Sequence, residues 1–458
     1  MTQAPVLYWM RRDFRLSDNP ALFAAQTRPV IPVFICDETV TGLGAAPRFR
    51  LSRAIAEFGD RLAGQGGRLI LRRGDALAVL RALAAETGAG AVMWNRLYDP
   101  AARARDTRVK AALRAQGLRV ESHNAHLLFE PWTVATGSGG PYRVYSPFWR
   151  AVRGRDVAAP LPAPDLTWPA MWPASDALSD WRFEAGMGRG AAIVAGHLSV
   201  GAVAAEARLT TFIEDKAQTY SGDRDRLDRD GTSGLSEPLA YGEISPRRCW
   251  QAGFEAMQRG VAGAETFLKE LVWREFASHL MFHFPTLAEQ SWRREWHRFP
   301  WRGDSAEAER WRRGQTGVDV IDAAMRELYV TGRMHNRARM LVASYLTKHL
   351  MTDWRVGLDW FAETLTDWDP ASNAMGWQWV AGPGPDAAPF FRIFNPETQA
   401  AKFDPEGRYR QHWLRGAGAR QFGVAAPPGW RPDPLRPPMI GLAEGRARAL
   451  AAYRALRA

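Results

Sequence analysis

Short apolar runs alternate with longer amphipathic stretches through the first third of the chain. Five of these runs have the length of a buried strand, and three stretches between them have helical periodicity. Alternating strands and helices predict a parallel sheet covered by helices, so we expect a Rossmann-like α/β domain. No GxGxxG follows the first run, so this domain lacks the usual dinucleotide-binding fingerprint. The predicted strands are Val6–Met10, Val30–Cys36, 68–72, 91–94 and 118–121, and the predicted helices are 49–63, 75–86 and 101–116.

After about residue 195 the hydrophobic pattern turns helical and stays so to the end. A connector comes before it, because residues 160–176 carry five prolines and predict irregular structure. Within residues 318–332, Ile321, Met325 and Leu328 share one stripe, and Gly332 is placed to end the helix. A second proline-rich stretch, 426–438, precedes a last short helix, and no internal repeats occur. We therefore predict an α/β domain over 1–130, an interdomain linker over 131–198 and a larger all-α domain over 199–458.

Length and composition fit a globular protein of more than one domain. The chain has 458 residues, of which 46% are hydrophobic and 24% charged. No run of eighteen apolar residues occurs, which argues against a membrane span, and the opening MTQAPVLYWMRRDFR does not have the form of a secretory signal. Cys36 and Cys249 are the only cysteines, so we expect neither a disulfide framework nor a metal site, and we place the protein in the cytoplasm.

Two numbers depart from the average. The formal net charge is +11, which suits a polyanionic partner such as a nucleic acid. The alternative is an arginine-rich composition from a GC-rich genome, and charge alone does not separate the two. The chain also has 20 tryptophans. Each tryptophan must bury its ring and satisfy its N–H group, so we expect most of them in the core. A number this far above average indicates that some tryptophans have a role besides packing.

Two of these tryptophans stand close together in SNAMGWQWVAG, residues 372–382. Positions two apart on a helix do not share a face. Trp377 and Trp379 are therefore expected to point in different directions and to serve different purposes.

Several segments together resemble the photolyase/cryptochrome family of flavin-dependent DNA repair enzymes and light receptors. The resemblance runs from end to end, in the order found in that family. It implies an FAD molecule in the helical domain, damaged DNA as the partner and a monomer. The segments are YWMRRDFRLSDNPAL, GPYRVYSPFWR, DGTSGLSEPLAYGEISPRRC, ELVWREF, TGRMHNRARM, DWDPASNAMGWQW and APFFRIFNPETQAAKFDPEG.

The resemblance also implies which residues bind the cofactor. Hydroxyl and backbone N–H groups of GTSGLS, at a helix start, can hold the pyrophosphate, whereas the alternative is a simple capping loop. Relatives often carry Arg where this chain has Gly234, so one cationic contact is absent at that position. Arg339 is the expected ion partner of Asp367, and Asn373 matches the residue that faces the reactive flavin nitrogen. The cofactor-binding set implied is Tyr220, Thr232, Ser233, Gly234, Leu235, Ser236, Arg274, Asn336, Arg339, Asp367, Trp368, Asp369 and Asn373.

The question raised by the two tryptophans receives an answer from the same resemblance. Trp377 matches the inner member of an electron-transfer chain, followed by Trp354 and by Trp301 at the surface. Trp379 instead matches a ring that lines the lesion cavity, opposite Trp273. Without the resemblance, each of these tryptophans would be assigned to the core.

The resemblance implies a lesion cavity with aromatic walls and a basic rim. A dimerised base must leave the duplex stack before it can be repaired. Glu270 would hydrogen-bond the base edge and Met340 would give an adaptable apolar contact. For the basic residues the alternative is a solvated basic face. The rim that would hold the DNA phosphates is Arg224, Arg274, Arg337, Arg392 and Lys402.

Two positions indicate which lesion is repaired. Relatives that repair the six-four photoproduct carry histidines at the positions of Asn336 and Met340. Their absence favours the cyclobutane pyrimidine dimer, and the adjacent His335 is assigned a structural role. The sequence thus predicts a deoxyribodipyrimidine photo-lyase in which Trp301, Trp354, Trp377, Asn373 and Glu270 carry the chemistry. The alternatives are a cryptochrome-like blue-light receptor and a flavin-free basic DNA-binding protein.

The antenna chromophore is the remaining cofactor to predict. The whole-chain pattern resembles a proteobacterial branch that uses methenyltetrahydrofolate, so we expect this folate, with deazaflavin or no antenna as alternatives. One branch of the family contacts its folate through an Asn–Glu pair. The matching positions here are Ala101 and Ala102, which argues against that form of the pocket.

Overall fold

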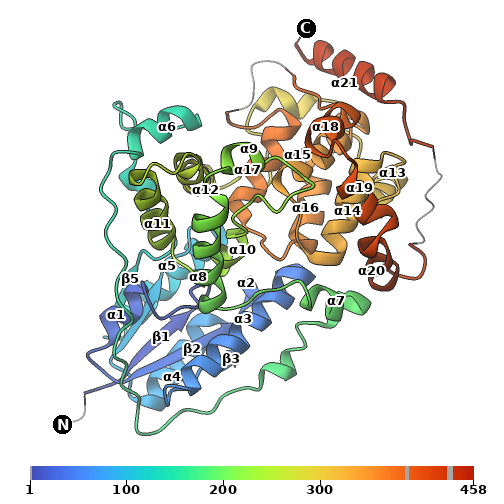
Figure 1. Cartoon of the computed structure of the whole chain (residues 1–458). Helices are drawn as coiled ribbons and strands as arrows, with labels where there is room; N and C mark the ends of the chain where they lie inside the picture. The colour runs from blue at the N-terminus through green and yellow to red at the C-terminus, as the bar shows by residue number, and fades with distance from the viewer. Residues whose placement is uncertain (1–2, 387–390, 431–436, 458) are drawn as a thin grey trace.

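The computed structural model describes residues 3–386, 391–430 and 437–457 (Figure 1). The segment 387–390, which belongs to one of the family-like stretches, and the segment 431–436 of the second proline-rich stretch lie outside the described residues. An α/β unit at the N-terminal end is followed by a larger helical unit, as expected (Figure 1). No helix in the described ranges is long and apolar enough to span a membrane.

The N-terminal unit is built on one five-stranded parallel sheet in the order β3-β2-β1-β4-β5. Alternate residues of β1 point to opposite faces: Tyr8 belongs to the core with α1 and α3, whereas Trp9 belongs to the core with α4 and α5. Helices therefore cover both faces, which explains why the strands are apolar throughout. The bounds are β1 Val6–Met10, α1 Pro20–Ala25, β2 Val30–Cys36, α2 Glu38–Thr41, α3 Ala45–Ala63, β3 Ile70–Arg73, α4 Ala76–Thr87, β4 Ala91–Asn95, α5 Pro100–Arg114 and β5 Arg119–His123.

The predicted elements are confirmed, with small shifts at their ends. The first two strands agree at both ends. Helix α3 begins four residues before the predicted start, at Ala45, with Pro47 inside its first turn. Proline is tolerated there because the first N–H groups of a helix have no intrahelical partner.

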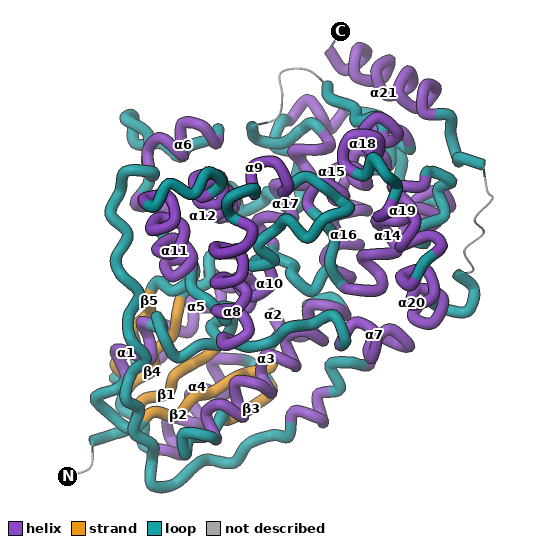
Figure 2. The backbone as a smooth tube through the Cα atoms, viewed as in Figure 1, coloured by secondary structure: helices purple, strands orange, loops and turns teal. Residues whose placement is uncertain are grey.

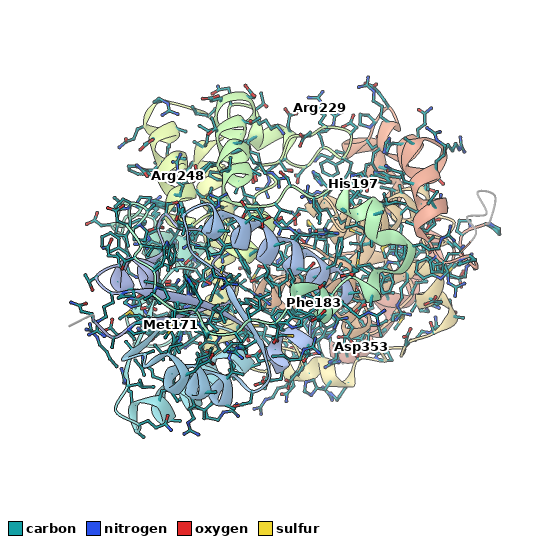
Figure 3. The ribbon with its side chains drawn as sticks, turned by 90° about the horizontal axis from the view of Figure 1, so that it is seen from below. Met171, Phe183, His197, Arg229, Arg248 and Asp353 are labelled. Carbon is teal, nitrogen blue, oxygen red and sulfur yellow. The ribbon has the colours of Figure 1, made fainter. Side chains whose placement is uncertain are left out.

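The connector lies along the outside of the sheet unit (Figure 2). Its Thr167 carbonyl accepts a hydrogen bond of 2.8 Å from the Val30 N–H at the start of β2. Further on, Met171 is 84% exposed while Phe183 is buried (Figure 3). The irregular structure predicted for residues 160–176 is confirmed. This segment is held against the sheet unit by the hydrogen bond between Thr167 and Val30.

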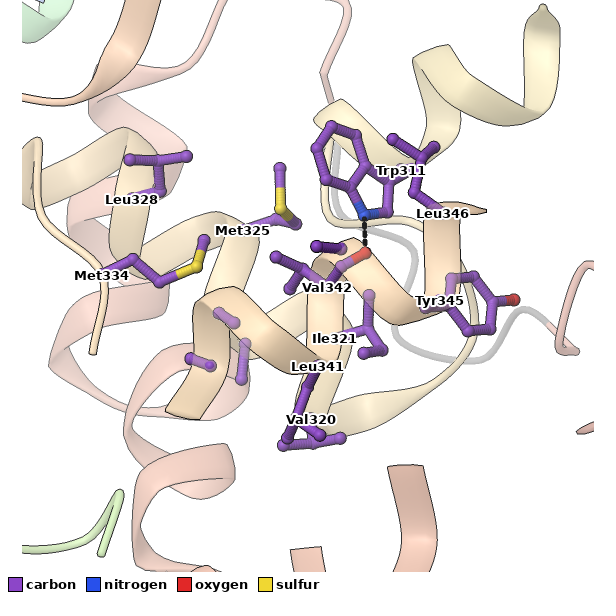
Figure 4. Packing of buried hydrophobic residues seen from close by; sticks show 14 of the residues in the cluster. Trp311, Val320, Ile321, Met325, Leu328, Met334, Leu341, Val342, Tyr345 and Leu346 are labelled. Atoms are coloured by element: carbon purple, nitrogen blue, oxygen red, sulfur yellow. Dashed lines mark hydrogen bonds between the residues drawn. The ribbon is translucent and has the colours of Figure 1, made fainter. Parts of the chain in front are cut away.

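The described residues of the helical unit pack around two large cores, and a small third cluster contains Trp296, Phe299 and Met351. One core surrounds Trp311, whose indole N–H donates to the Val342 carbonyl at 3.1 Å (Figure 4). The other core lies around helix α12. The predicted stripe of Ile321, Met325 and Leu328 is buried on α14, and Gly332 ends that helix in the left-handed conformation, as expected.

The remaining helices complete this unit. The last helix, α21, has 16 residues and is therefore longer than the short helix expected. The bounds are α6 Tyr145–Val152, α7 Ala191–Ala195, α8 Ala202–Thr211, α9 Tyr220–Asp223, α10 Ser236–Tyr241, α11 Pro246–Gln258, α12 Ala264–His283, α13 Ala306–Arg312, α14 Asp319–Thr331, α15 Asn336–Ser344, α16 Trp354–Thr364, α17 Pro370–Ala381, α18 Pro396–Phe403, α19 Arg408–Arg415, α20 Ala417–Ala425 and α21 Leu442–Arg457.

Candidate cofactor and lesion site

Asp367 joins three segments that are far apart in the sequence. Its Oδ2 accepts hydrogen bonds of 2.7 Å from the Ser236 hydroxyl at the start of α10 and from the Arg339 guanidinium on α15. Arg339 is fixed in turn by a 2.8 Å bond from its Nε to the Met334 carbonyl. The predicted ion pair of Arg339 with Asp367 is present, and the Asp367 side chain is 3% exposed.

Several polar atoms of the predicted cofactor-binding residues are buried without a hydrogen-bond partner among the described residues. They include Oδ1 of Asp367, Oδ1 of Asn373 and Nε1 of Trp368. Unpaired buried polar groups are costly, so they indicate a polar ligand or ordered water. Their mixture of acceptors and a donor fits the edge of a heteroaromatic cofactor, which presents both kinds of group.

Helix α17 places Asn373 by a well-defined start. Asp369 accepts a 2.8 Å hydrogen bond from the Ser372 N–H, and Pro370 occupies the first turn. The Asn373 amide then donates to the Leu358 carbonyl at 3.0 Å, which leaves its Oδ1 for a ligand. Asp369 therefore acts first as a helix cap, a role that the resemblance did not supply.

The segment Thr232–Ser236 leads directly into α10. Gly234 is exposed with φ of +62°, a conformation that favours glycine. Arg208 on α8 donates to the Gly234 carbonyl at 2.5 Å. Arg208 is not among the residues predicted from the sequence, and it places a cation beside Gly234.

The predicted electron-transfer tryptophans lie on adjacent segments. Trp354 and Trp377 are buried, and a Cβ at Gly357 on α16 would overlap the Trp377 ring. Trp301 follows on the surface side, where it is partly buried and its ring centroid lies 6.0 Å from that of Trp296. The indole N–H groups of Trp301, Trp354 and Trp377 are buried without a partner.

Two backbone hydrogen bonds join the segment of Trp301 to that of Trp354. The Arg302 N–H donates to the Met351 carbonyl, and the Asp353 N–H donates to the Arg302 carbonyl, both at 2.8 Å. These bonds place the residue after Trp301 beside the residue before Trp354.

Trp379 points away from Trp377, as expected from their spacing. Trp377 packs edge-to-face against Phe361, with ring centroids 4.9 Å apart. Trp379 is partly buried and its N–H donates to the Asp386 carbonyl at 3.1 Å. The two rings therefore belong to different surroundings.

Trp273, the other predicted wall of the lesion cavity, is held by a stacked ring. Tyr145 lies face to face with it, with centroids 3.6 Å apart and planes at 5°. The Tyr145 hydroxyl donates to the Lys269 carbonyl at 2.7 Å, which fixes this ring on α12. Tyr145 lies in the GPYRVYSPFWR segment, so the sequence contained the signal although no role was assigned.

Glu270 and Arg224 form an ion pair at 2.5 Å beside these rings. Burial raises the pKa of the Glu270 carboxyl above its usual value, although the Arg224 charge acts against this shift. Met340 is partly buried on α15, one turn after the exposed Asn336. An acid with a raised pKa beside aromatic rings can donate or accept a hydrogen bond to a base edge.

The remaining basic residues of the predicted rim differ in their surroundings. Arg392 and Lys402 are exposed, and Arg337 pairs with Asp225 at 2.6 Å. Arg274 instead donates to the His126 carbonyl at 2.6 Å and lines a cavity between the two units. Arg274 therefore faces the cavity between the units, whereas Arg392 and Lys402 face the solvent.

His335 has the structural surroundings expected for it. Its Nδ1 accepts a hydrogen bond of 3.1 Å from the Arg337 N–H, which starts helix α15. Burial lowers the pKa of the imidazole to about 4. A neutral helix-capping ring is consistent with this position.

Comparison with known proteins identifies the relationship. The profile of the N-terminal domain named DNA photolyase matches residues 6–165, and that of the FAD binding domain of DNA photolyase matches residues 267–419. The deoxyribodipyrimidine photo-lyase of Agrobacterium fabrum is 44% identical, over 99% of this chain and 98% of its own. Cryptochrome-1 of Arabidopsis thaliana is 36% identical over 89% of this chain, which matches 62% of that protein.

The fold agrees with these sequence relationships. The crystal structure of a bacterial class III photolyase from Agrobacterium tumefaciens superposes with a TM-score of 0.93 at 44% identity, covering 100% of this chain and 98% of that one. Both the sheet unit and the helical unit are therefore shared along the full length. The chain belongs to the photolyase/cryptochrome family.

Proposed function

We propose that this chain is a deoxyribodipyrimidine photo-lyase, which uses light and bound FAD to split cyclobutane pyrimidine dimers in DNA. The observation that carries the proposal is the convergence of Ser236 and Arg339 on Asp367, whose Oδ1 is buried without a partner among the described residues, as is the Oδ1 of Asn373. The 44% identity to a photo-lyase along almost the whole chain supports the same activity.

The residues around Asp367 would hold the FAD. Asp367 and Asn373 would offer hydrogen-bond acceptors to it and Trp368 a donor, and the loop from Thr232, with Arg208, would hold its phosphates. Tyr220 and Asn336 complete the predicted set. When bound, FAD supplies the light-driven one-electron chemistry, and the protein supplies position and electrostatics.

The lesion would lie between Trp273 and Trp379, with Met340 beside it. The Tyr145 stack keeps the Trp273 ring in one orientation, so the wall is formed before DNA arrives. Burial raises the pKa of the Glu270 carboxyl, and the ion pair with Arg224 keeps that group oriented. A dimer costs less to unstack than intact bases, which favours a flipped-out dimer as the ligand of these rings.

The exposed cations would hold the DNA phosphates. Arg392 and Lys402 are solvent-exposed, and Arg337 is held by Asp225. Arg224 is shared between Glu270 and this rim. These contacts would set affinity and orientation rather than sequence preference.

The three tryptophans would pass an electron inward from the protein surface. Trp301, Trp354 and Trp377 lie on segments joined by backbone hydrogen bonds and by the packing of Trp377 on Gly357. Such a route would restore the reduced cofactor after oxidation, without taking part in dimer splitting itself.

We also propose a folate antenna, methenyltetrahydrofolate, in the cavity between the two units. This cavity is lined by Tyr98, Asp99 and His126 on one side and by Arg274 and Asp369 on the other. Asp99 caps α5 two positions before Ala101. The cavity therefore lies next to Ala101 and Ala102, the positions that match the folate-contacting Asn–Glu pair of one branch of the family. Extraction of the bound pigment and its absorbance spectrum will distinguish folate from deazaflavin.

Three further proposals concern the whole protein. We place the domain boundaries near residues 130 and 198, the protein in the cytoplasm and the active species as a monomer. The two ends of the predicted linker have different neighbours: α6 packs in the core of the helical unit, whereas the stretch around Thr167 hydrogen-bonds to the sheet unit, which supports treating residues 131–198 as a separate linker. Sedimentation of the holoprotein measures the oligomeric state.

The deciding experiment is repair of a defined substrate. Oligothymidine that contains cyclobutane dimers is mixed with the reduced holoprotein in the dark and then under blue light, and the recovery of thymine absorbance is followed. Recovery in the light and none in the dark is the expected result. A protein that binds FAD but leaves the dimers intact would refute repair and favour the light-receptor alternative. A folded protein that binds no FAD would refute both.

A further inference from the structure

Helix α10 connects the cofactor site to the N-terminal sheet unit. Its first residue, Ser236, contacts Asp367, whereas its last residue, Tyr241, lies against the loop after β1. The Phe14 N–H donates to the Tyr241 carbonyl at 3.2 Å, and Arg15 donates to the Gly242 carbonyl at 2.9 Å. The helix is therefore held at both ends.

A buried group of charges lies along the side of this helix. Arg50 of α3 is fully buried, its Nε donates to Glu237, and its NH2 donates to Glu243 at 2.6 Å. Glu237 also pairs with Arg333 at 2.6 Å. Two cations and two carboxylates thus balance within the group, which we call the Arg50 cluster.

The Arg50 cluster reaches the other side of the cofactor site as well. Thr366, the residue before Asp367, lies 3.5 Å from Glu237 through its hydroxyl. The same hydroxyl donates to the Gly332 carbonyl at 3.0 Å, which anchors the turn before α15. Glu237 directly follows Ser236 on α10 and contacts Thr366, the residue before Asp367. It therefore links the two segments that carry Ser236 and Asp367.

We propose that Arg50 is a positioning residue for the FAD site, acting across the interface between the two units through Glu237. Arg50 contacts Glu237, Glu243 and the Tyr241 ring, none of which is among the residues assigned to the cofactor or the lesion. Its rigid guanidinium fork fixes Glu237 and Glu243 together, and this sets the separation of Ser236 and Asp367. The inference rests on the proposed function, because it assumes that these two residues border the FAD.

Removal of Arg50 alone would leave two buried carboxylates with one cation, a state that proteins tolerate badly. The variant R50M therefore tests stability and positioning at once. The double variant R50M/E243Q removes one charge of each sign and leaves the Glu237–Arg333 pair intact. R50K keeps the charge without the fork, and R61A, which breaks the partly exposed pair of Arg61 with Glu57 on the same helix, is the matched control.

The experiment measures how fast full-length holoprotein releases FAD, from the rise in flavin fluorescence, with circular dichroism as the check of folding. We expect release to be about tenfold faster in R50M/E243Q, intermediate in R50K and unchanged in R61A. We also expect the bound-flavin absorbance spectrum to lose fine structure in the double variant, which a loss of stability alone does not cause.

Folded R50M/E243Q that releases FAD at the wild-type rate, with an unchanged spectrum, would overturn the inference and leave the proposed function intact. Wild-type protein that binds no FAD would refute the proposed function and this inference together. If neither methionine variant folds, R50K decides: release faster than that of R61A supports positioning, and equal release overturns it.

Discussion

At the scale of single residues, the site depends on groups whose polar atoms the protein leaves free. Trp301 is the residue for which the function is most easily separated from the fold, because it is partly exposed and its indole N–H has no partner among the described residues. Replacing Trp301 by Phe keeps an aromatic ring but removes the readily oxidised indole. We expect this variant to lose photoreduction of oxidised FAD while repair by chemically reduced protein stays within about twofold of wild type. Flavin absorbance under illumination with a thiol measures the first, and the dimer assay the second. Normal photoreduction by W301F would show that the electron route is wrong.

A second prediction at this scale concerns Glu275. Burial raises the pKa of its carboxyl to about 7, although the Leu128 and Phe129 N–H groups donate to it at 2.8 and 3.1 Å. The folded state therefore binds a proton more tightly than the unfolded state, whose carboxyl titrates near 4.5. Stability should fall as the pH rises from about 4.5 to 7, by roughly 3 kcal/mol from this group. Urea unfolding across that range measures the fall, and E275Q should flatten it. An equal slope in both proteins would contradict the assignment.

At the scale of elements, the helix pair α16 and α17 determines where Trp377 lies. Gly357 is the point of closest approach, since a Cβ there would overlap the Trp377 ring. We expect G357A to destabilise the protein by about 1–3 kcal/mol, because the buried ring must move, and to slow photoreduction. Denaturant unfolding and flavin photoreduction measure the two effects. The control is Gly59→Ala in α3, where a Cβ meets nothing within 4 Å. It should be neutral or stabilising by up to about 1 kcal/mol.

The helices and strands were the features that the sequence predicted best. Strands and helices of the sheet unit follow from apolar runs because burial on both faces leaves little choice of residue. The site was predictable only through the family resemblance, since Asp367, Ser236 and Arg339 are distant in sequence and no local pattern joins them. The roles of Arg50 and Arg208 were not predicted, because the sequence around an isolated arginine on a helix does not indicate which residues its side chain will contact. Tyr145 was visible in a quoted segment, but its stack on Trp273 depends on tertiary packing.

At the scale of the whole molecule, the net charge of +11 should govern the encounter with DNA. Affinity for dimer-containing DNA should fall as salt rises, with a slope that reflects the number of phosphates contacted. We expect K402A to weaken binding evenly across sequences and to lower the magnitude of that slope by about one. Titration of labelled duplex at several salt concentrations measures both. R119A removes an exposed arginine of β5, in the sheet unit, and should leave the slope unchanged.

The path of the connector has a consequence for dissecting the molecule. It leaves the sheet unit, returns to the start of β2 through Thr167 and passes the exposed Met171 before reaching the helices. Cleavage at Met171 would therefore yield two fragments that stay joined by the Arg50 cluster and by the hydrogen bonds of Phe14 and Arg15 to the end of α10. Separately expressed halves divided at this point should reassemble, which would make the chain suitable as a split reporter whose reconstitution is read from bound flavin.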